Sequence, residues 1–451
     1  MPIRRSPAVL LIVVLLFLTA CSASPSQTVT DLPGFTDVAG AATSTPTPRP
    51  PTTTPRPSTA TPIPPTITRT PVPPTATPVP PTRTPSPRPA TSTRTPSPRP
   101  STATRTPTTG GDGVITATLP QGFVAQRGFW QVYFTAPTGS RDSSTYVGGV
   151  DEMLAASIAG ARQTIDMVAY EFNLPTITRA LLDAHARGVR VRMVTDRQDG
   201  LDDEETTLDQ LVDAGIPIVP DTRNALMHDK FVIIDSTFVW TGSMNYTIND
   251  VYRNNNNAIV LRSRNAVANY QAEFDEMFVN GQFGPRSPEN TPNVMFTQDG
   301  IPIEMYFAPE TDVLPVLLRE LNSATESIRF MTFSFTIDEM GESILNRFDA
   351  GVSVQGIFET VGSETQFSEL TPLFCAGIDV RQDGNSFVLH HKVIIIDGET
   401  VLTGSFNFSA SALESNDENL VIIRDPSLAN QYLEEFARRW SEAGAPDGLD
   451  C

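Results

Sequence analysis

The chain repeats one stretch of sequence, and this duplication constrains its fold more than any other feature. Residues 215–278 align with residues 377–440 at a constant offset of 162 and without a gap. Upstream, at an offset of 163, residues 188–191 match residues 351–354, and both read Gly-Val-x-Val. Identical residues at matched positions include Gly215 and Gly377, His228 and His390, Lys230 and Lys392, Asp235 and Asp397, Asn245 and Asn407, and Tyr270 and Tyr432. The duplication predicts two copies of one folding unit.

Hydrophobic periodicity within each copy alternates between strand and helix. The predicted elements are strands at 165–169, 189–194, 328–335 and 352–358, helices at 175–187 and 340–348, hairpins formed by 231–235 with 238–241 and by 393–397 with 400–403, and helices that end at Phe278 and Trp440. This alternation predicts an α/β fold. We expect two duplicated α-β-α sandwich halves with mixed sheets, packed about a pseudo-twofold axis around one shared active site.

The first quarter of the chain has a different composition. Of the 40 prolines, 22 lie between Pro46 and Pro107, in a stretch without any aromatic residue. Such a segment cannot bury enough apolar surface to offset its ordering entropy. It is therefore expected to be a disordered tether that favours an extended polyproline II form.

The N-terminus has the features of an export signal. Arg4 and Arg5 precede an apolar run from Ala8 to Ala20, which is shorter than the ~20 residues that a membrane-spanning helix needs. Residues 18–21 read Leu-Thr-Ala-Cys, which resembles the lipobox of bacterial lipoproteins. The resemblance implies a lipidated Cys21 and an extracytoplasmic protein anchored to the bacterial cell membrane. An ordinary secretion signal that ends in cysteine is the alternative.

These observations divide the chain into five expected segments. They are a signal peptide at 1–20, a lipidated N-terminal segment at 21–45, a Pro/Thr-rich disordered tether at 46–112, and two repeats at 113–285 and 286–451. If Cys21 is lipidated, Cys375 and Cys451 remain. An oxidising compartment permits a bridge between them, and a buried Cys375 with a free Cys451 fits the sequence equally well.

The two lysines of the chain, Lys230 and Lys392, occupy equivalent places in the two copies. Both sit in the pattern His-x-Lys-x-x-x-x-Asp, which begins at His228 and His390. All other basic side chains apart from histidine are arginine, so these positions need a compact ammonium rather than a planar guanidinium. A point charge of this kind fits beside one phosphate oxygen.

The spacing of the motif suits phosphate chemistry. Residues i and i+2 of a strand point to the same face, so each histidine projects together with its lysine. One neutral imidazole can attack phosphorus while a second, protonated imidazole donates to the leaving oxygen. The lysines and the amides of Asn245 and Asn407 can stabilise the added negative charge.

At these residues the chain resembles the phospholipase D superfamily, whose signature is this motif twice in one active site. The resemblance covers Tyr133 to about Trp440 and includes Gly-Ser-x-Asn at 242–245 and 404–407. It implies a phosphohistidine intermediate, with His228 as the nucleophile and His390 as the acid. The catalytic set it implies is His228, Lys230, Asp235, His390, Lys392 and Asp397, with substrate contacts from Ser243, Asn245, Ser405, Asn407 and Glu418.

The two copies differ at one position that bears on the histidines. Glu418 in the second copy matches Asn256 in the first. Family members often hold a catalytic imidazole with a carboxylate here, and a carboxylate raises the pKa of its partner histidine, so the two imidazoles are not expected to be equivalent. Asp235 and Asp397 lie at strand ends, which favours a supporting role over proton transfer.

Charge and composition narrow the substrate classes. From residue 111 onward the chain has 22 basic and 49 acidic side chains, a net charge of −27, which disfavours nucleic acid. The membrane anchor and the acidic body favour a monomeric enzyme that hydrolyses or transfers phosphatidyl groups. A metal-independent endonuclease and an inactive surface module that binds phosphate remain as alternatives. Cysteines and histidines do not cluster with zinc spacing, and lysines take the place of a metal at the phosphate, so neither metal nor cofactor is expected.

Overall fold

A computed structural model describes residues 108–449 and residue 451. The expected signal peptide, Cys21 and nearly all of the expected tether lie outside the described residues. The described residues form one compact unit. Within this part of the chain, no helix combines the length and the hydropathy that crossing a membrane requires.

The first half builds a ten-stranded mixed sheet. Its strands are β1 (Thr108–Thr109), β2 (Ile115–Leu119), β3 (Gly122–Arg127), β4 (Trp130–Thr135), β5 (Thr164–Ala169), β6 (Arg190–Asp196), β7 (Ile218–Asp221), β8 (Lys230–Ile234), β9 (Phe238–Gly242) and β10 (Asn257–Leu261). They lie in the order β1-β2-β3-β4-β10-β9-β8-β5-β6-β7. Only β5, β6 and β7 pair in parallel. The helices are α2 (Val150–Gly160), α3 (Pro175–Ala186), α4 (Leu208–Asp213), α5 (Ile248–Tyr252) and α6 (Arg264–Phe278), with short helical turns η1 (Ser143–Thr145), η2 (Arg197–Leu201) and η3 (Gly284–Arg286).

The second half repeats this arrangement with eight strands. They are β11 (Met295–Gln298), β12 (Ile301–Ala308), β13 (Ser327–Thr332), β14 (Ser353–Phe358), β15 (Asp379–Gln382), β16 (Lys392–Ile396), β17 (Thr400–Gly404) and β18 (Glu418–Arg424). Their order is β11-β12-β18-β17-β16-β13-β14-β15, so β16 stands where β8 stands in the first sheet. The helices are α7 (Leu314–Ser323), α8 (Asp338–Asp349), α9 (Leu370–Cys375), α10 (Ala410–Glu414) and α11 (Pro426–Glu442).

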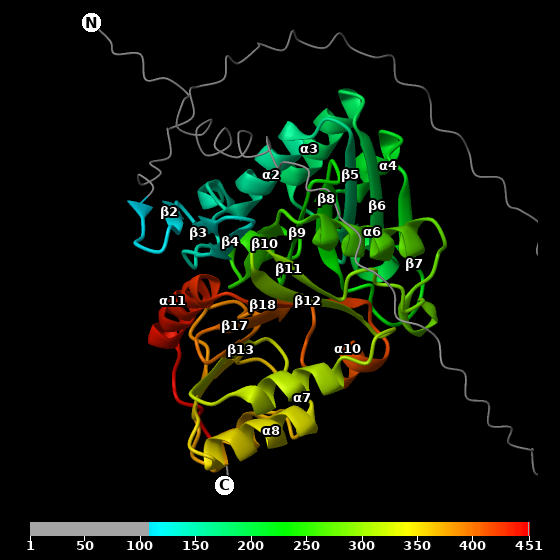
Figure 1. The fold of residues 1–451 in the computed structure, drawn as a ribbon. Helices are drawn as coiled ribbons and strands as arrows, with labels where there is room; N and C mark the ends of the chain where they lie inside the picture. Colours follow the sequence, from blue (N-terminus) through cyan, green and yellow to red (C-terminus); the bar gives the residue numbers. More distant parts are fainter. Residues whose placement is uncertain (1–107, 450) are drawn as a thin grey trace, which may run out of the picture. The chain divides into compact units, whose positions relative to one another are not determined.

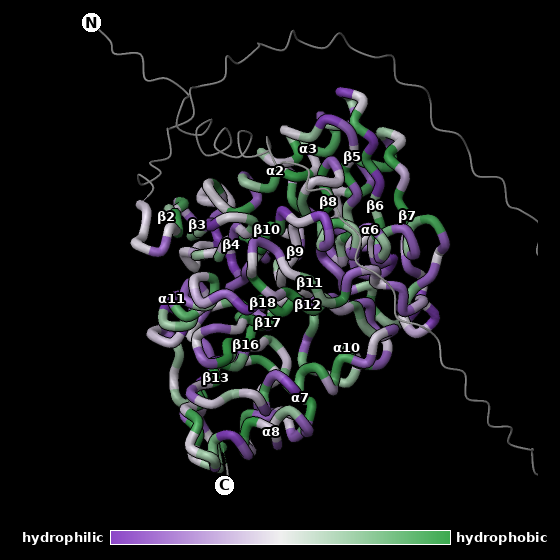
Figure 2. The backbone as a smooth tube through the Cα atoms, viewed as in Figure 1, coloured by the Kyte–Doolittle hydropathy of each residue, from purple (hydrophilic) through white to green (hydrophobic). Residues whose placement is uncertain are grey.

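Layers of helix and sheet alternate through the molecule. Figure 1 shows α2 and α3 on the outer side of the first sheet and α7 and α8 on the outer side of the second. One continuous apolar core joins the inner faces of both sheets with α6 and α11; it includes Phe231 of β8, Val393 of β16, Tyr270 and Tyr432. Central strands such as β12 and β18 are coloured as hydrophobic in Figure 2. The two halves are therefore joined by a shared apolar core.

The hairpins that follow the motif strands have a specific turn. Asp235 and Ser236 both have φ of 51°, and Asp397 and Gly398 have φ of 54° and 65°. The main-chain N–H of Thr237 donates to the carbonyl of Ile234 at 2.9 Å, which closes the first turn. Two consecutive positive φ values make a type I′ turn, whose twist matches that of a two-stranded hairpin. The last residue of each motif thus has a backbone role.

The predicted fold class is confirmed, with differences at element boundaries. The strand expected at 328–335 ends at Thr332, because Phe333 leaves the sheet beside the active site. Strands β1 to β4 form an antiparallel extension that the repeat did not predict, since only the first half carries all four. β1 lies inside the segment 46–112 expected as a tether, so ordered structure begins a few residues earlier than expected.

The question left open for the cysteines has an answer in the structure. Cys375 at the end of α9 and the terminal Cys451 form a disulfide, with Cα atoms 5.4 Å apart. The bridge closes a loop with a sequence separation of 76. Closing so long a loop lowers the entropy of the unfolded chain, so the bridge stabilises the second half.

Candidate active site

Each motif histidine is held by the backbone of the opposite half. His228 lies two residues before β8, and its main-chain N–H donates to the carbonyl of Asp417 at 3.0 Å. His390 lies two residues before β16, and its N–H donates to the carbonyl of Asn255 at 2.9 Å. Isolated parallel bridges, Met227 with Asp417 among them, accompany these bonds. The site therefore forms only when the two halves are docked.

The His228 side chain pairs with a buried carboxylate. Its Nδ1 lies 2.9 and 2.8 Å from the two carboxylate oxygens of Glu418, and both side chains are almost inaccessible. Ser405 Oγ donates to Glu418 Oε2 at 2.7 Å, which fixes the carboxylate. A carboxylate partner keeps the proton on Nδ1 and leaves the Nε2 lone pair free. The pair therefore orients His228 as a nucleophile.

The His390 side chain has a different partner. Its Nδ1 lies 3.0 Å from Asn256 Oδ1 and 3.2 Å from Asp250 Oδ1. Asn256 Nδ2 in turn donates to Asp250 Oδ1 at 2.8 Å, and Ser243 Oγ donates to Asn256 Oδ1 at 2.8 Å. The second-half counterpart of Asp250 is Ala412. The partner of His228 is thus a single carboxylate, whereas His390 faces an amide and a carboxylate that also binds this amide.

The two lysines are buried in equivalent positions. Lys230 and Lys392 are each 1% exposed. Each ammonium donates to the carbonyl of its own motif histidine, at 2.5 Å for Lys230 and 3.0 Å for Lys392. Each also lies 4.9 Å from an aromatic ring centre, that of Tyr170 or of Phe333. Buried ammonium groups with so few partners are ready to bind an anion.

Burial and the lysines control protonation in the free site. Burial lowers the pKa of His228 well below its usual value, and the charges of Lys230 and Lys392 lower it further. Burial and Lys392 likewise lower the pKa of His390 to about 3, against the opposing effect of Asp250. The pKa of each imidazole therefore depends on the lysines of both halves, so the four groups lie in one site. Without an anion bound, both histidines are neutral at pH 7.

The carboxylates that face the histidines differ in pKa. Burial raises the pKa of Glu418 to about 8, although both lysines act in the other direction. Against the effect of its burial, hydrogen bonding and the charge of His390 hold the pKa of Asp250 far below its usual value. Asp250 is thus ionised across the working pH range and favours a protonated His390.

The residues expected to contact substrate fall into two groups. Asn245 and Asn407 each have a buried Oδ1 without a hydrogen-bond partner within residues 108–449, but only their Nδ2 groups can donate to an anion, and Asn245 Nδ2 donates to Glu171 Oε2 at 3.2 Å. Ser243 and Ser405 are fully buried and donate to the partners of the histidines. Together with Glu418 they support the imidazoles from behind, and their contact with substrate stays a prediction.

The motif aspartates lie outside the site. Asp235 follows β8 at the end opposite His228, roughly 20 Å along the strand. Its carboxylate accepts from the main-chain N–H groups of Arg162, Gln163 and Thr164 at 2.7–3.2 Å. Asp397 accepts in the same way from residues 325–327. Both tie a hairpin turn to the start of a neighbouring strand, which agrees with the supporting role favoured by their position at strand ends.

Several residues near the histidines were not predicted. The Tyr170 ring packs edge-on at 4.9 Å from that of His228, and the Phe333 ring does the same at 4.9 Å from His390. Both follow the first strand of their copy at the offset of 163, so the repeat carried a signal for them. Asp250 was missed because no identical residue marks it in the second copy.

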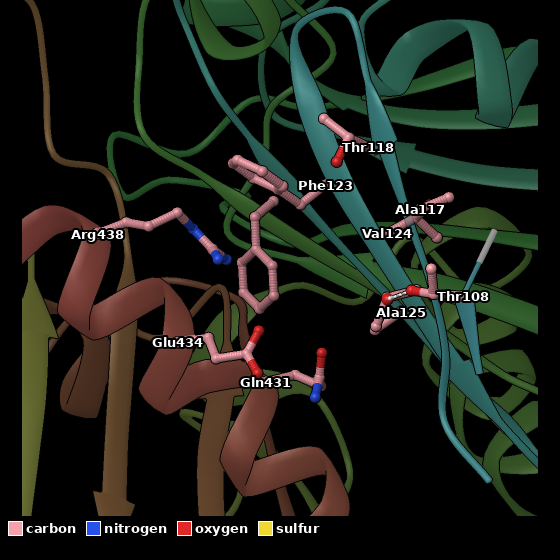
Figure 3. A pocket seen from close by; sticks show the side chains of 11 residues that line it. Thr108, Ala117, Thr118, Phe123, Val124, Ala125, Gln431, Glu434 and Arg438 are labelled. Atoms are coloured by element: carbon pink, nitrogen blue, oxygen red, sulfur yellow. Dashed lines mark hydrogen bonds between the residues drawn. The ribbon is translucent and has the colours of Figure 1, made fainter. Parts of the chain in front are cut away.

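A groove of ≈ 650 Å³ lies elsewhere, between β2 and β3 on one side and α11 on the other. Figure 3 shows Phe123, Glu434 and Arg438 around it. None of its lining residues belongs to the two motifs or contacts the four groups described above. The chemistry therefore does not take place in this groove.

The family model described as "Cardiolipin synthase, PLD-like domain" matches residues 154–278 and again residues 317–440. A mitochondrial cardiolipin hydrolase of Chlamydomonas reinhardtii is 36% identical over 120 residues, which are 27% of this chain and 54% of that protein. A phospholipase D of Rickettsia prowazekii is 33% identical over 31% of this chain and 68% of its own length. The chain thus spans between about half and two thirds of these relatives.

One solved structure aligns with both halves together. Phosphatidylserine synthase of Haemophilus influenzae covers 67% of this chain and 87% of its own, with 14% identity and a TM-score of 0.53. At this identity the likeness concerns the fold. The two proteins therefore share a fold over most of the length of the synthase.

We expect Asp235→Ala to reduce stability and leave catalysis unchanged. Three main-chain N–H groups lose their acceptor, which lowers the free energy of unfolding by about 1–3 kcal/mol. Denaturant unfolding measures the loss, and kcat at 25 °C measures the chemistry. Asp235→Asn keeps one acceptor oxygen and serves as the milder control. A large loss of kcat with unchanged stability would make Asp235 catalytic after all.

Proposed function

The chain belongs to the PLD-like domain family, and from that premise we propose that it is a phosphodiesterase that works through a phosphohistidine. One observation carries the proposal: two buried imidazoles, each beside a buried lysine, have unlike partners at Nδ1. Two histidines with the same partners would have the same protonation state, so neither would be distinguished as the nucleophile or the acid. Unlike partners assign one as the nucleophile and the other as the acid.

In the first step His228 Nε2 attacks phosphorus. The Nε2–P bond forms and the bond from phosphorus to the leaving oxygen breaks, while His390 gives its Nε2 proton to that oxygen. The negative phosphodiester lies between the lysines and offsets their effect on His390. Asp250 then stabilises the protonated imidazole, so His390 carries a proton in the complex although it is neutral in the free site.

In the second step the phosphohistidine is released. Water or an alcohol loses a proton to His390 and attacks phosphorus, and the bond to His228 Nε2 breaks. Lys230, Lys392 and the side-chain amides of Asn245 and Asn407 stabilise the charge on the non-bridging oxygens in both steps. Glu418 keeps the His228 ring in place as its charge changes.

Exposed apolar side chains beside the site favour a phospholipid as the substrate. Phe333, Val361 and Phe367 are 37%, 79% and 67% exposed. Phe333 directly follows β13 and packs against His390, and Val361 and Phe367 lie in the segment 359–369 that follows β14. Large apolar groups left in water at the mouth of a site mark a surface that another apolar phase covers. Acyl chains or a bilayer surface supply that phase.

Two arginines lie at the same mouth. The guanidinium groups of Arg141 and Arg253 lie 5.2 and 5.4 Å from the ring centre of Phe387, three residues before His390. They supply local positive charge for an anionic phospholipid in a body whose net charge is −27. That overall charge repels a long polyanion and so disfavours nucleic acid as the substrate. We therefore propose that the protein is a lipid phosphodiesterase. We expect it to act as a monomer.

The substrate class is tested by a comparison in EDTA. The protein is incubated with phospholipid vesicles that contain cardiolipin and, separately, with single-stranded and plasmid DNA at about 50 mM salt. We expect lipid turnover in the parent and none in His228→Ala, because the nucleophile is gone. Cleavage of DNA without lipid turnover would contradict the lipid proposal, and no cleavage of either would favour a phosphate-binding module.

The roles of the two histidines are tested with leaving groups. A phosphodiester that releases p-nitrophenolate needs no proton on the leaving oxygen, whereas an alkyl phosphodiester does. We expect His390→Ala to lose on the order of 10²–10⁴-fold in kcat/KM on the alkyl ester and much less on the nitrophenyl ester. His228→Ala loses activity on both. Equal losses of His390→Ala on the two esters would contradict the assignment of His390 as the acid.

The N-terminal segments complete the proposal. A lipid on Cys21 and a Pro-rich tether place the catalytic body outside the cytoplasm, at a distance from the membrane that carries it. The disulfide between Cys375 and Cys451 supports an oxidising compartment. We expect Cys21→Ser to move the protein from the membrane fraction to the soluble fraction with unchanged specific activity. Persistent membrane association of that variant would contradict lipidation as the anchor.

A further inference from the structure

A buried cluster of carboxylates lies behind the motif strand of the first half. Glu273 and Glu276 lie on α6, and Glu310 follows β12 in the second half. One carboxylate oxygen from each lies within 4.8 Å of the others. Glu273 and Glu276 are only 4% and 2% exposed. Three carboxylates in so little space repel one another unless something neutralises them.

Unpartnered oxygens accompany the cluster. Glu276 Oε1 and Glu310 Oε2 are buried, and no donor among residues 108–449 reaches them. Asp229, which lies between His228 and Lys230 and points to the opposite face of the strand, is 0% exposed and also has a free carboxylate oxygen, Oδ2. Asp229 interacts electrostatically with both Glu273 and Glu310, so a fourth carboxylate lies close to the cluster.

The second half provides an internal comparison. Glu435 on α11 is the counterpart of Glu273, and it contacts two arginines and a histidine. Its carboxylate lies 2.8 Å from Arg438 Nε, 3.0 Å from Arg439 Nε and 3.3 Å from His391 Nε2. Against its burial, these contacts lower the pKa of Glu435 to about 2.

The first half lacks each of these three groups. The counterparts of Arg438, Arg439 and His391 are Glu276, Met277 and Asp229. Arg223, which approaches from the side of Asp417, is paired with Asp221 and with Asp417 itself. Where the second half holds arginine charge, the first half therefore holds carboxylates and a methionine.

We propose that Glu273, Glu276 and Glu310 bind one Ca²⁺ ion, which occupies the place that arginine charge fills in the second half. Ca²⁺ takes six to eight oxygen ligands at 2.3–2.6 Å, so two oxygens on opposite sides of one ion lie about 4.6–5.2 Å apart. The spacing of the three carboxylates falls within that reach. The donor set contains oxygen alone, and the buried hydroxyl of Ser287, which interacts with Glu276, is a further candidate ligand.

The ion links the two halves without entering the reaction. It joins α6 of the first half to Glu310 of the second, across the interface that carries the histidines. Asp229 Oδ1 accepts from Asn419 Nδ2 at 2.6 Å, and Asn419 follows Glu418 in the chain. The site thus lies behind the pair of His228 and Glu418, and its expected effect is on stability rather than on the chemical step.

The test uses the full chain, first stripped with EGTA. Calorimetry is run in EGTA and in about 1 mM CaCl₂, and titration calorimetry measures stoichiometry. We expect one Ca²⁺ per chain and a rise in Tm on the order of 5 °C, because a ligand that binds only the folded state stabilises it. Mg²⁺ is expected to act more weakly, since it dehydrates reluctantly and requires a tighter octahedral shell.

Two variants separate a metal site from a merely structural cluster. Glu276→Gln and Glu310→Gln remove a repelling charge, so each is expected to be at least as stable as the parent in EGTA and to lose the Ca²⁺ shift. Asp275→Asn, which changes an exposed carboxylate on the same helix, keeps the shift. Absence of Ca²⁺ binding and of any Tm shift in the parent overturns the proposal, and protons then neutralise the cluster. A shift that persists in both glutamine variants overturns it as well.

Discussion

Reciprocal bonding between the halves is the interaction on which the rest of the structure depends. The backbone of each histidine is held by the other half, through Asp417 for His228 and Asn255 for His390. The partner of each imidazole also comes from the other half. Asn257 extends the pattern by accepting from Thr403 and Tyr432 across the interface. One copy alone cannot assemble such a site. The apolar core that runs without interruption between the two sheets holds the copies together.

Departures from symmetry give the pseudo-symmetric site its direction. Equivalent frames place two histidines and two lysines in the same way, but Glu418 faces one imidazole while Asn256 and Asp250 face the other. Burial makes these substitutions effective, because a charge in a dry interior acts far more strongly than one in water. The same logic applies behind the motif strands, where Glu273 lacks the arginines that neutralise Glu435. Duplicated positions are therefore most informative where the two copies disagree.

Sequence reasoning reached the main elements of both halves because apolar periodicity and an ungapped repeat support the same assignment. It reached His228, Lys230, His390 and Lys392 because identical residues occupy matched positions. It did not distinguish residues that support the histidines from residues that contact substrate. Ser243, Ser405 and Glu418 were expected to contact substrate, but they lie behind the histidines. Asp250 has no counterpart, and strands β1 to β4 lie mostly outside the repeat, so neither carried a signal of this kind.

The sequence by itself determined the duplicated α/β fold, the two lysine-containing motifs and the inequality of Glu418 and Asn256. These follow from local pattern and from comparison of the two copies, which need no knowledge of distance. Only the tertiary structure decided that each partner serves the histidine of the opposite half, that Asp235 and Asp397 hold turns, and that Cys375 meets Cys451. The physical reason is that these contacts join residues from 70 to 190 positions apart, and their geometry exists only after both sheets have packed on the shared core.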